Sequence, residues 1–217
     1  MNAAAVLGAA ALLALAGCGQ PGGDHHAHRF DGAEKWARIF DDPARDAWQK
    51  PAEVIRTLRL SANATVADLG AGTGYFAVRL ARAVPAGRVY GVDTEPDMVR
   101  YLGERAQRER LANVTPVQAE AREPKLPVAV DLVLVVNTYH HIPSRVEYLR
   151  QLKTALKPGG RIAIIDFLEE APMGPPRRAR IPARAVVDEF GRAGYALVER
   201  HDFLPHQYFL VFTAKAG

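Results

Sequence analysis

TVADLGAGTGYF, residues 65–76, is the stretch that decides the fold. A short apolar run ends in three glycines at alternate positions, and a helical pattern follows in which Phe76, Leu80 and Val84 recur at a spacing of four. The order strand, glycine turn, helix is the first unit of a doubly wound α/β domain. Because glycine has no Cβ, the turn can be tight and a ligand can lie against the main chain near the helix N-terminus.

The spacing of the glycines distinguishes between ligands. The dinucleotide fingerprint is G-x-G-x-x-G, whereas this chain has G-x-G-x-G, with Tyr75 where the last glycine of the fingerprint would stand. Asp68, two positions before Gly70, suits a ligand with a cationic amino group better than one with a pyrophosphate. DLGAGTG, residues 68–74, resembles motif I of the class I S-adenosylmethionine (SAM) dependent methyltransferases. An NAD-dependent oxidoreductase is the alternative that this spacing disfavours.

Composition limits the kinds of partner. The 217 residues are 48% hydrophobic, which suits one globular domain with a short extension. The net charge of +4 favours an anionic small molecule or a lipid surface and is too small to indicate nucleic acid. A histidine-rich tract at residues 25–28 has only Asp24 as a further ligand nearby, so we expect a linker there and no metal site.

The first residues resemble a targeting segment. Residues 3–16 form an unbroken apolar run, too short to span a bilayer and typical of a signal-peptide core. The run ends in LAGC, residues 15–18, which resembles the lipobox of bacterial lipoproteins, a family in which the cysteine is lipidated. We therefore expect a signal peptide over 1–18, a flexible linker over 19–28 and a lipid-anchored protein of the bacterial cell envelope, attached through Cys18. The segment before the run has no Lys or Arg, so a misassigned start and a cytoplasmic protein is the alternative.

Residues 29–60 are expected to form an N-terminal helical cap. One helical pattern carries Trp36, Ile39 and Phe40 on one face, and a second begins after Pro51. In class I methyltransferases, helices before the first strand often lie over the cofactor and shape the substrate site, and the resemblance implies the same here. Packing of the aromatic rings on the sheet is the alternative for Trp36 and Phe40.

Two further strand ends supply candidate ligands for a nucleoside. Asp93 ends the apolar segment 88–93, where a carboxylate can accept hydrogen bonds from both ribose hydroxyls. Capping of the next helix is the alternative for this residue. Glu120 follows the predicted strand 114–118, and the resemblance implies that its carboxylate meets the adenine amino group. Gln118 in another register, or a plain surface role for the glutamate, are the alternatives.

The most apolar segment after the leader is VDLVLVV, residues 130–136, which predicts a central parallel strand buried on both faces. It opens into NTYHHI, residues 137–142, where the switch-point rule places side chains in the ligand crevice. This run resembles motif IV of small-molecule methyltransferases. If the acceptor needs a base, His140 and His141 are candidates because neutral imidazole is available near pH 7, and Tyr139 is an alternative. A purely structural role for these side chains is also open.

The remainder of the chain completes the predicted topology. LKPGGRIAIID, residues 156–166, is similar to the turn and fifth strand of the methyltransferase family. Residues 169–180 form a loop rich in Pro and Arg, which either selects the substrate or is a solvated charge run. A helix over 182–191 and strands over 196–201 and 207–213 follow. The family topology makes the last strand antiparallel and inserts it between the fifth and the sixth.

Together these motifs predict, over residues 61–217, an α/β domain with a Rossmann-like, doubly wound seven-stranded sheet, mostly parallel with an antiparallel last strand. The resemblance implies a SAM-dependent methyltransferase that acts on a small-molecule acceptor. A membrane-anchored, non-catalytic module that binds a nucleoside or metabolite is the alternative. The glycines would admit the methionine portion of SAM, Asp68 would lie near its amino group, and Asn137 would border its methionine end. The implied cofactor-binding residues are Asp68, Gly70, Ala71, Gly72, Thr73, Gly74, Asp93, Glu120 and Asn137.

Overall fold

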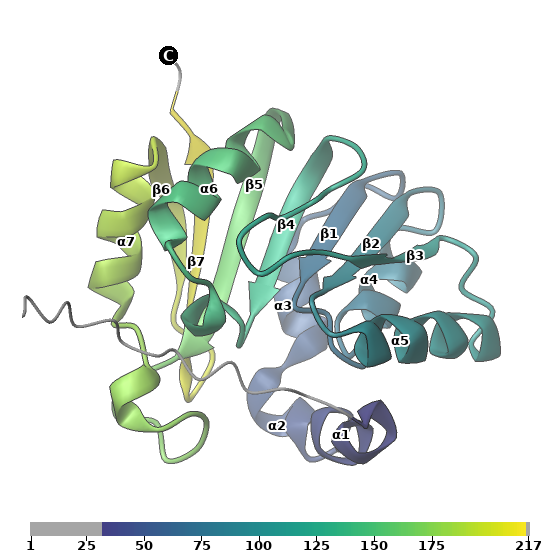
Figure 1. Cartoon of the computed structure of the whole chain (residues 1–217). Helices are drawn as coiled ribbons and strands as arrows, with labels where there is room; N and C mark the ends of the chain where they lie inside the picture. The colour runs from purple at the N-terminus through teal and green to yellow at the C-terminus, as the bar shows by residue number, and fades with distance from the viewer. Residues whose placement is uncertain (1–31, 216–217) are drawn as a thin grey trace, which may run out of the picture.

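The computed structural model describes residues 32–215, so the predicted signal peptide, lipobox and linker lie outside the described residues. A single seven-stranded sheet with the order β3-β2-β1-β4-β5-β7-β6 runs through the middle of the molecule (Figure 1). Its strands are β1 (Thr65–Leu69), β2 (Arg88–Asp93), β3 (Val114–Gln118), β4 (Val130–Val136), β5 (Leu156–Phe167), β6 (Tyr195–His201) and β7 (Gln207–Ala214). The pairings of β7 with β5 and β6 are antiparallel and the other pairings are parallel, which confirms the predicted fold.

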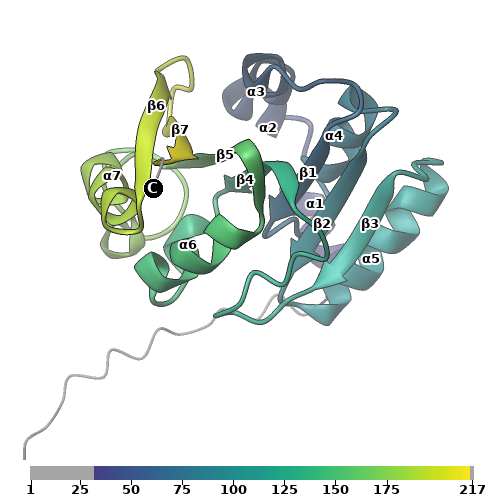
Figure 2. The same ribbon diagram turned by 90° about the horizontal axis from the view of Figure 1, so that it is seen from above.

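Helices cover both faces of this sheet. The α-helices are α1 (Ala33–Phe40), α2 (Arg45–Gln49), α3 (Pro51–Leu58), α4 (Ala77–Ala83), α5 (Pro96–Arg108), α6 (Arg145–Thr154) and α7 (Ala183–Arg192), and two short 3-10 turns are η1 (Tyr139–His141) and η2 (Arg177–Ala179). Helices α3, α4 and α5 pack on one face, whereas α6 and α7 pack on the other, as the view from above shows (Figure 2). The domain is therefore a three-layer α/β/α structure.

Strand β4 explains why the core has two halves. Leu132 and Leu134 belong to the apolar cluster under α3, α4 and α5, whereas Val133 and Val135 belong to the cluster under α6 and α7. Successive side chains of a strand point to opposite faces, so a strand covered on both sides must be apolar at every position. The near-continuous apolar run in the sequence follows from this position in the middle of the sheet.

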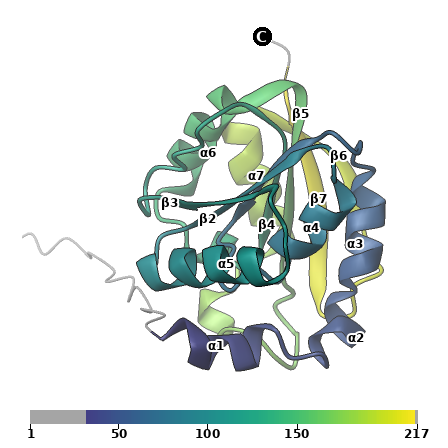
Figure 3. The same ribbon diagram turned by 90° about the vertical axis from the view of Figure 1, so that its right-hand side faces the viewer.

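The segment before β1 contains one helix more than the sequence pattern predicted. Helix α2 lies between the two predicted helices, and its five residues are too few to show a periodicity. Gln49 is the one residue of this helix that is buried. Together α1 and α2 lie below the carboxyl ends of the parallel strands, which is the edge where ligands bind in doubly wound folds (Figure 3).

One side chain organises the loop after β5, residues 168–182. The guanidinium of Arg180 donates hydrogen bonds of 2.7–3.2 Å to the backbone carbonyls of Leu168, Glu169, Ala171, Met173 and Pro175. The loop wraps around this planar donor, whose fork geometry suits several acceptors at once. Of the arginines in the predicted charge run, Arg180 therefore has a structural role, whereas Arg177 and Arg178 are exposed.

Replacing Arg180 by methionine keeps the apolar stem of the side chain and removes its donors, which leaves the carbonyls of the loop without a shared partner. We expect Arg180→Met to lower the free energy of unfolding by about 2 kcal/mol and to make residues 168–182 a site of rapid proteolysis. Urea denaturation and limited proteolysis measure the two effects. Arg178→Met, at an exposed position of the same loop, is the matched control. Equal cleavage of the two variants would show that the guanidinium does not hold the loop.

Candidate functional site

The glycine turn between β1 and α4 has a backbone that few other residues can adopt. The φ angles of Gly70, Gly72 and Gly74 are 72°, 52° and 93°, all in the left-handed region. A Cβ at Gly70 would stand 2.2 Å from the hydroxyl oxygen of Thr138, and one at Gly74 would stand 2.5 Å from a methyl group of Leu102. The turn therefore packs directly against the end of β4 on one side and against α5 on the other.

Asp68 lies below this turn and is almost completely buried, with 3% of its surface exposed. Its Oδ2 atom has no hydrogen-bond partner among the described residues. Burial, aided by the nearby Asp93 carboxylate and opposed by the Arg45 guanidinium, raises the pKa of the Asp68 carboxyl to about 7. A cationic group brought to Asp68 would relieve both the burial of its charge and the missing partner.

Thr73, within the turn itself, also has a buried side-chain oxygen without a partner among residues 32–215. It is buried at 1% exposure, and its Oγ1 atom also lacks a partner in the described part of the chain. A buried polar atom without a partner costs free energy. Two such atoms at one turn indicate a place where a polar ligand completes the hydrogen bonding. Ala71, between the glycines, is buried as well.

Asp93 links the end of β2 to the glycine turn. Its Oδ2 accepts a hydrogen bond of 2.8 Å from the amide of Gly72, and its Oδ1 accepts one of 3.0 Å from the amide of Glu95. Burial raises the pKa of the Asp93 carboxyl, and these amides oppose the rise. Since a carboxylate offers about four acceptor positions, it retains capacity for hydroxyl donors. Asp93 thus binds the amide before α5, as in the capping alternative, and is still available to a ribose.

The cap covers the glycine turn. The ring of Phe40, at the end of α1, lies 3.6 Å from the position that a Cβ of Gly72 would occupy, and Trp36 stacks on Phe40 with 5.4 Å between ring centroids. Arg105 of α5 donates to the carbonyl of Thr73 at 3.0 Å and to the carboxylate of Asp41 at 2.7 Å. The cap and the turn are therefore joined through one arginine, and Phe40 lies against the turn.

Helix α2 brings a half-buried cation to the site. Arg45 packs over the ring of Tyr75, 3.9 Å from its centroid, and donates to the carbonyl of Phe40 at 2.8 Å. It also donates to Oε1 of Gln49 at 3.2 and 3.4 Å. No carboxylate among the described residues forms an ion pair with it, and burial lowers its pKa to about 10. A half-buried guanidinium with only neutral acceptors suits an anionic group of a ligand.

Three amide side chains close a ring beside Arg45. Gln49 donates to Gln207 at 2.6 Å, Gln207 donates to the side-chain oxygen of Asn137, and Asn137 donates back to Gln49 at 3.3 Å. The ring joins the cap to the end of β4 and the start of β7. Asn137 has φ 55°, a left-handed conformation that asparagine tolerates better than most residues. It was the only member of the ring that the motifs predicted.

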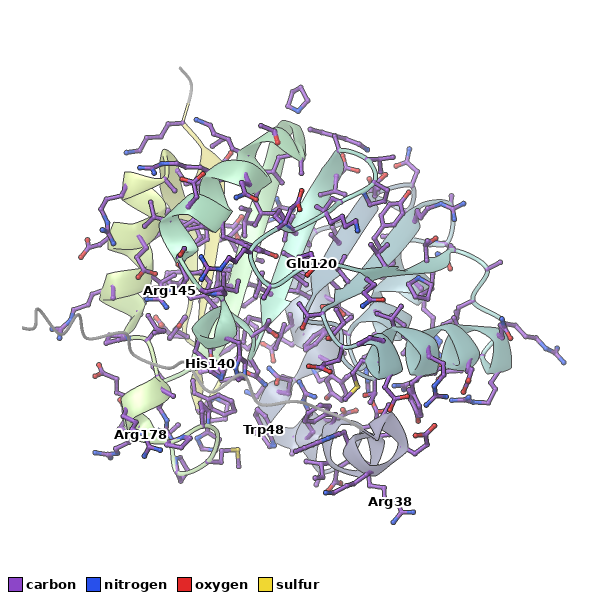
Figure 4. All side chains as sticks on the ribbon, in the orientation of Figure 1. Arg38, Trp48, Glu120, His140, Arg145 and Arg178 are labelled. Carbon is purple, nitrogen blue, oxygen red and sulfur yellow. The ribbon has the colours of Figure 1, made fainter. Side chains whose placement is uncertain are left out.

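The turn after β4 places a histidine against a strand-end carboxylate. Nδ1 of His140 lies 3.0 Å from Oδ1 and 2.9 Å from Oδ2 of Asp166, which ends β5. The exposed fractions of the two side chains are 5% and 3%. The neighbouring His141 is exposed, and its ring centroid lies 4.1 Å from that of His140. Figure 4 shows His140 at the ends of the strands, near the same edge as Trp48 of the cap.

Tyr139 has other partners. Its side chain is fully buried, and its hydroxyl donates to Oε2 of Glu189 at 2.7 Å. Glu189 of α7 also binds Arg145 of α6 through two bonds of 2.7 and 2.8 Å. Burial and the Glu189 carboxylate raise the pKa of the Tyr139 hydroxyl above its ordinary value. This geometry joins η1 to α6 and α7, so we remove Tyr139 from the candidate bases and assign it a packing role.

Glu120 follows Ala119, whose amide donates to the backbone carbonyl of Asp93 at 3.0 Å. It is exposed, it follows β3, and its backbone forms an isolated bridge with Glu123 (Figure 4). Its contact with an adenine stays a prediction. No group of three or more His, Cys, Asp or Glu side chains within residues 32–215 is arranged to hold a metal ion.

Comparison with known sequences gives a consistent picture. The model of a family described as a methyltransferase domain matches residues 60–189. The chain is 31% identical over 132 residues to the trans-aconitate 2-methyltransferase of Rhodopseudomonas palustris, a match that covers 61% of this chain and 48% of the relative. It is 29% identical over 121 residues to the demethylmenaquinone methyltransferase of Listeria welshimeri, covering 55% of this chain and 50% of the relative. The chain thus spans about half the length of these curated relatives.

A solved structure is similar over a larger share of the chain. The crystal structure of a SAM-dependent methyltransferase from Aquifex aeolicus superimposes with a TM-score of 0.77 at 26% sequence identity. The match covers 83% of this chain and 97% of that one. The same arrangement of strands and helices is therefore found in a SAM-dependent protein of nearly the same extent.

The raised pKa of Asp68 makes the stability of the ligand-free chain depend on pH. The folded-state pKa of about 7 exceeds the ordinary value of 3.8. The free energy of unfolding is therefore highest below pH 3.8, where Asp68 is protonated in both states, and falls as the pH rises to about 7. We expect Asp68→Asn to be more stable than the natural chain by about 2–4 kcal/mol at pH 8, and by much less at pH 4.5. Urea denaturation at the two pH values measures the difference.

Asp188→Asn, an exposed change on α7, is the matched control and should show no such dependence. An advantage of Asp68→Asn that is equal at pH 4.5 and pH 8 would mean that Asp68 does not titrate in this range.

Proposed function

The chain belongs to the class I SAM-dependent methyltransferases, and from this membership we propose that it transfers a methyl group from SAM to a small-molecule acceptor. The observation that carries the proposal is the buried Oδ2 atom of Asp68, which lacks a hydrogen-bond partner among the described residues, below a glycine turn whose Thr73 hydroxyl also lacks one. A ligand with a cationic amino group and further polar atoms would satisfy both. The amino-acid end of SAM has that chemistry.

The residues around the turn fit the parts of SAM. Asp68 would bind the ammonium group and Arg45 the carboxylate of its methionine portion, because a buried acid and a half-buried cation lie near one another here. Asp93 would hold the ribose through its remaining acceptor positions, and Glu120 would meet the adenine. Asn137 would border the methionine portion at the end of β4. When bound, SAM supplies an electrophilic methyl group on a sulfonium whose leaving group is a neutral thioether.

The acceptor would lie between the cap and the loop after β5. The ring centroid of Trp48 lies 5.9 Å from that of Phe167, the residue that follows Asp166, so an aromatic side chain of the cap lies against one at the end of β5. Trp48 and His140 lie near the same end of the strands (Figure 4). Aromatic walls with few polar groups are typical of small-molecule sites. The two curated relatives are named for trans-aconitate and demethylmenaquinone, which are both small molecules. These two compounds are the first acceptors to test.

Calorimetric titration of the full chain with SAM, S-adenosylhomocysteine and NAD tests the ligand. We expect micromolar binding of both adenosyl ligands and no binding of NAD. Asp93→Ala should weaken SAM binding by about 10–100-fold, since it removes acceptors for two hydroxyl donors. It also removes the acceptor of the Gly72 and Glu95 amides, and the thermal melt of the ligand-free variant measures that loss separately. Transfer of a labelled methyl group from SAM to the two acceptors then tests the reaction.

An unaltered SAM affinity in Asp93→Ala would contradict the ribose assignment. Absence of binding of either adenosyl ligand would favour the non-catalytic binding module. Asp188→Ala, remote from the turn, controls for the loss of one negative charge.

We propose separately that the chain is held at the bacterial cell envelope through a lipid on Cys18. The support is the apolar run at 3–16 and the LAGC sequence that follows it. No helix within residues 32–215 is long and apolar enough to cross a bilayer. The net charge of +4 is compatible with a surface of anionic lipid.

Cys18→Ala removes the only thiol of the chain and with it the proposed site of lipidation. We expect the natural chain in the membrane fraction and the variant outside it, because a lipid chain is what holds a lipoprotein to the bilayer. Fractionation of expressing cells followed by immunoblotting measures the distribution. The same distribution for both proteins would contradict the anchor.

A further inference from the structure

We infer that His140 and Asp166 form a base that removes a proton from the methyl acceptor, and that the acceptor is therefore a group with a removable proton, such as a hydroxyl, phenol or enol, and not a carboxylate. The inference rests on the proposed methyl transfer and names the class of its substrate. Asp166 is a residue that the motifs did not single out, because it lies within a segment whose resemblance is to a turn and a strand.

The Asp166 carboxylate is fixed on several sides. Its Oδ1 accepts the amide of Phe167 at 2.8 Å, its Oδ2 lies 3.3 Å from the amide of His140, and both oxygens lie within 3.0 Å of Nδ1 of that residue. An ionised carboxylate can only accept hydrogen bonds, so Nδ1 is the ring nitrogen that carries hydrogen. In the neutral ring, Nε2 is then left with a lone pair, which is the form a base requires.

The second nitrogen of this imidazole is available. Nε2 of His140 has no hydrogen-bond partner among the described residues. It does not belong to the fully buried atoms that lack a partner, so part of its surface is accessible. It therefore borders space that another molecule can reach. The turn that carries it begins two residues after Asn137, the member of the amide ring that borders the proposed methionine site.

The other titratable groups near the pair come from two elements. His141 lies on the same turn, with its ring beside that of His140. Tyr208 of β7 is paired in register with Asp166, and its buried hydroxyl has no partner among residues 32–215. A tyrosine at this place is a neutral neighbour at neutral pH, so it leaves the carboxylate of Asp166 as the charge that orients the imidazole.

A base favours one class of acceptor over another. A carboxylate is ionised at neutral pH and is already a nucleophile, so it has no proton for His140 to remove. A hydroxyl, phenol or enol has one, and its removal by a placed base is typically worth about 10²–10⁴-fold in rate. The presence of a buried imidazole–carboxylate pair at the strand ends therefore points to a protonated acceptor.

One proton and one methyl group move in the proposed step. The acceptor proton passes to Nε2 of His140, and the freed oxygen, or the carbon of an enol, forms a bond to the methyl carbon. The bond between the methyl carbon and the sulfonium sulfur breaks, and its electron pair goes to sulfur, which becomes a neutral thioether. The imidazolium that results is stabilised by the Asp166 carboxylate and later gives its proton to water.

A series of acceptors of graded acidity tests the base. Ring-substituted naphthols and phenols, from ordinary phenols with a pKa of about 10 down to ones near 7, are compared with trans-aconitate as the carboxylate probe. We expect His140→Gln to lower kcat by about 10²-fold for the least acidic acceptors, and by progressively less for the more acidic ones. SAM affinity should not change. A merely structural histidine would give an equal loss for every acceptor, and that result would overturn the inference.

Asp166 acts through His140 and is a positioning residue. Asp166→Asn should lower kcat for the same weakly acidic acceptors while leaving their KM nearly constant, and Asp166→Glu should restore part of the loss. A change of KM in Asp166→Asn with an unchanged kcat would overturn the assignment. A large loss of kcat in His141→Gln together with none in His140→Gln would overturn it as well.

Nitrogen-15 NMR of the full chain, with the His140 signals identified by their absence from His140→Gln, tests the pair without any acceptor. At pH 8 the spectrum should show hydrogen on Nδ1 and none on Nε2. Hydrogen on Nε2 would overturn the inference. If no acceptor of either class is methylated, the proposed function fails, and this spectrum still decides whether the pair has the form of a base.

Discussion

The close approach of Gly70 to Thr138 is the constraint on which the ligand edge of the sheet depends. A side chain at position 70 would overlap Thr138, so the exit of β1 and the exit of β4 can touch only because the first residue of the turn is glycine. Their contact brings two sets of groups to one place, with the acids Asp68 and Asp93 on one side and the turn bearing His140 on the other. A site that binds a cofactor and handles a second molecule needs both sets within one edge.

The cap is attached to this edge mainly by polar contacts. In α1 and α2 the buried residues are Ala33 and Gln49, and Ile39 is 56% exposed. The contacts that hold the cap are bonds from the start of α1 to Asp97, the Arg105–Asp41 pair and the amide ring. Segments with little buried apolar surface open at a lower free energy than the core. Helices α1 and α2, which cover the glycine turn, thus bury less apolar surface than α3, whose Val54 and Leu58 belong to the core.

Sequence reasoning located the strands well because each predicted one is either an apolar run or part of a motif with fixed spacing. The expected bounds of β2, β3 and β4 agree with the structure, and the glycine turn, Asp68 and Asp93 lie together as their spacing indicated. Sequence patterns did not identify residues whose role depends on a partner far away in the sequence. Gln49 contacts Gln207, 158 positions away, and neither residue belongs to a pattern. Arg45 stands in a helix too short to be periodic, and the role of Asp166 appears only when β5 lies beside the turn after β4.

The amide ring has a consequence for the order in which the molecule is made. Gln49 and Asn137 leave the ribosome long before Gln207, which opens the final strand of the described sheet. Until that strand is inserted between β5 and β6, the cap lacks the acceptor that holds α2 in place, and β5 lacks its antiparallel neighbour. Contacts between distant parts of a chain form late because they close large loops. The binding edge is therefore completed only after β7 has been synthesised, and a nascent chain that stops before β7 has the glycine turn without the Gln207 acceptor that holds α2 over it.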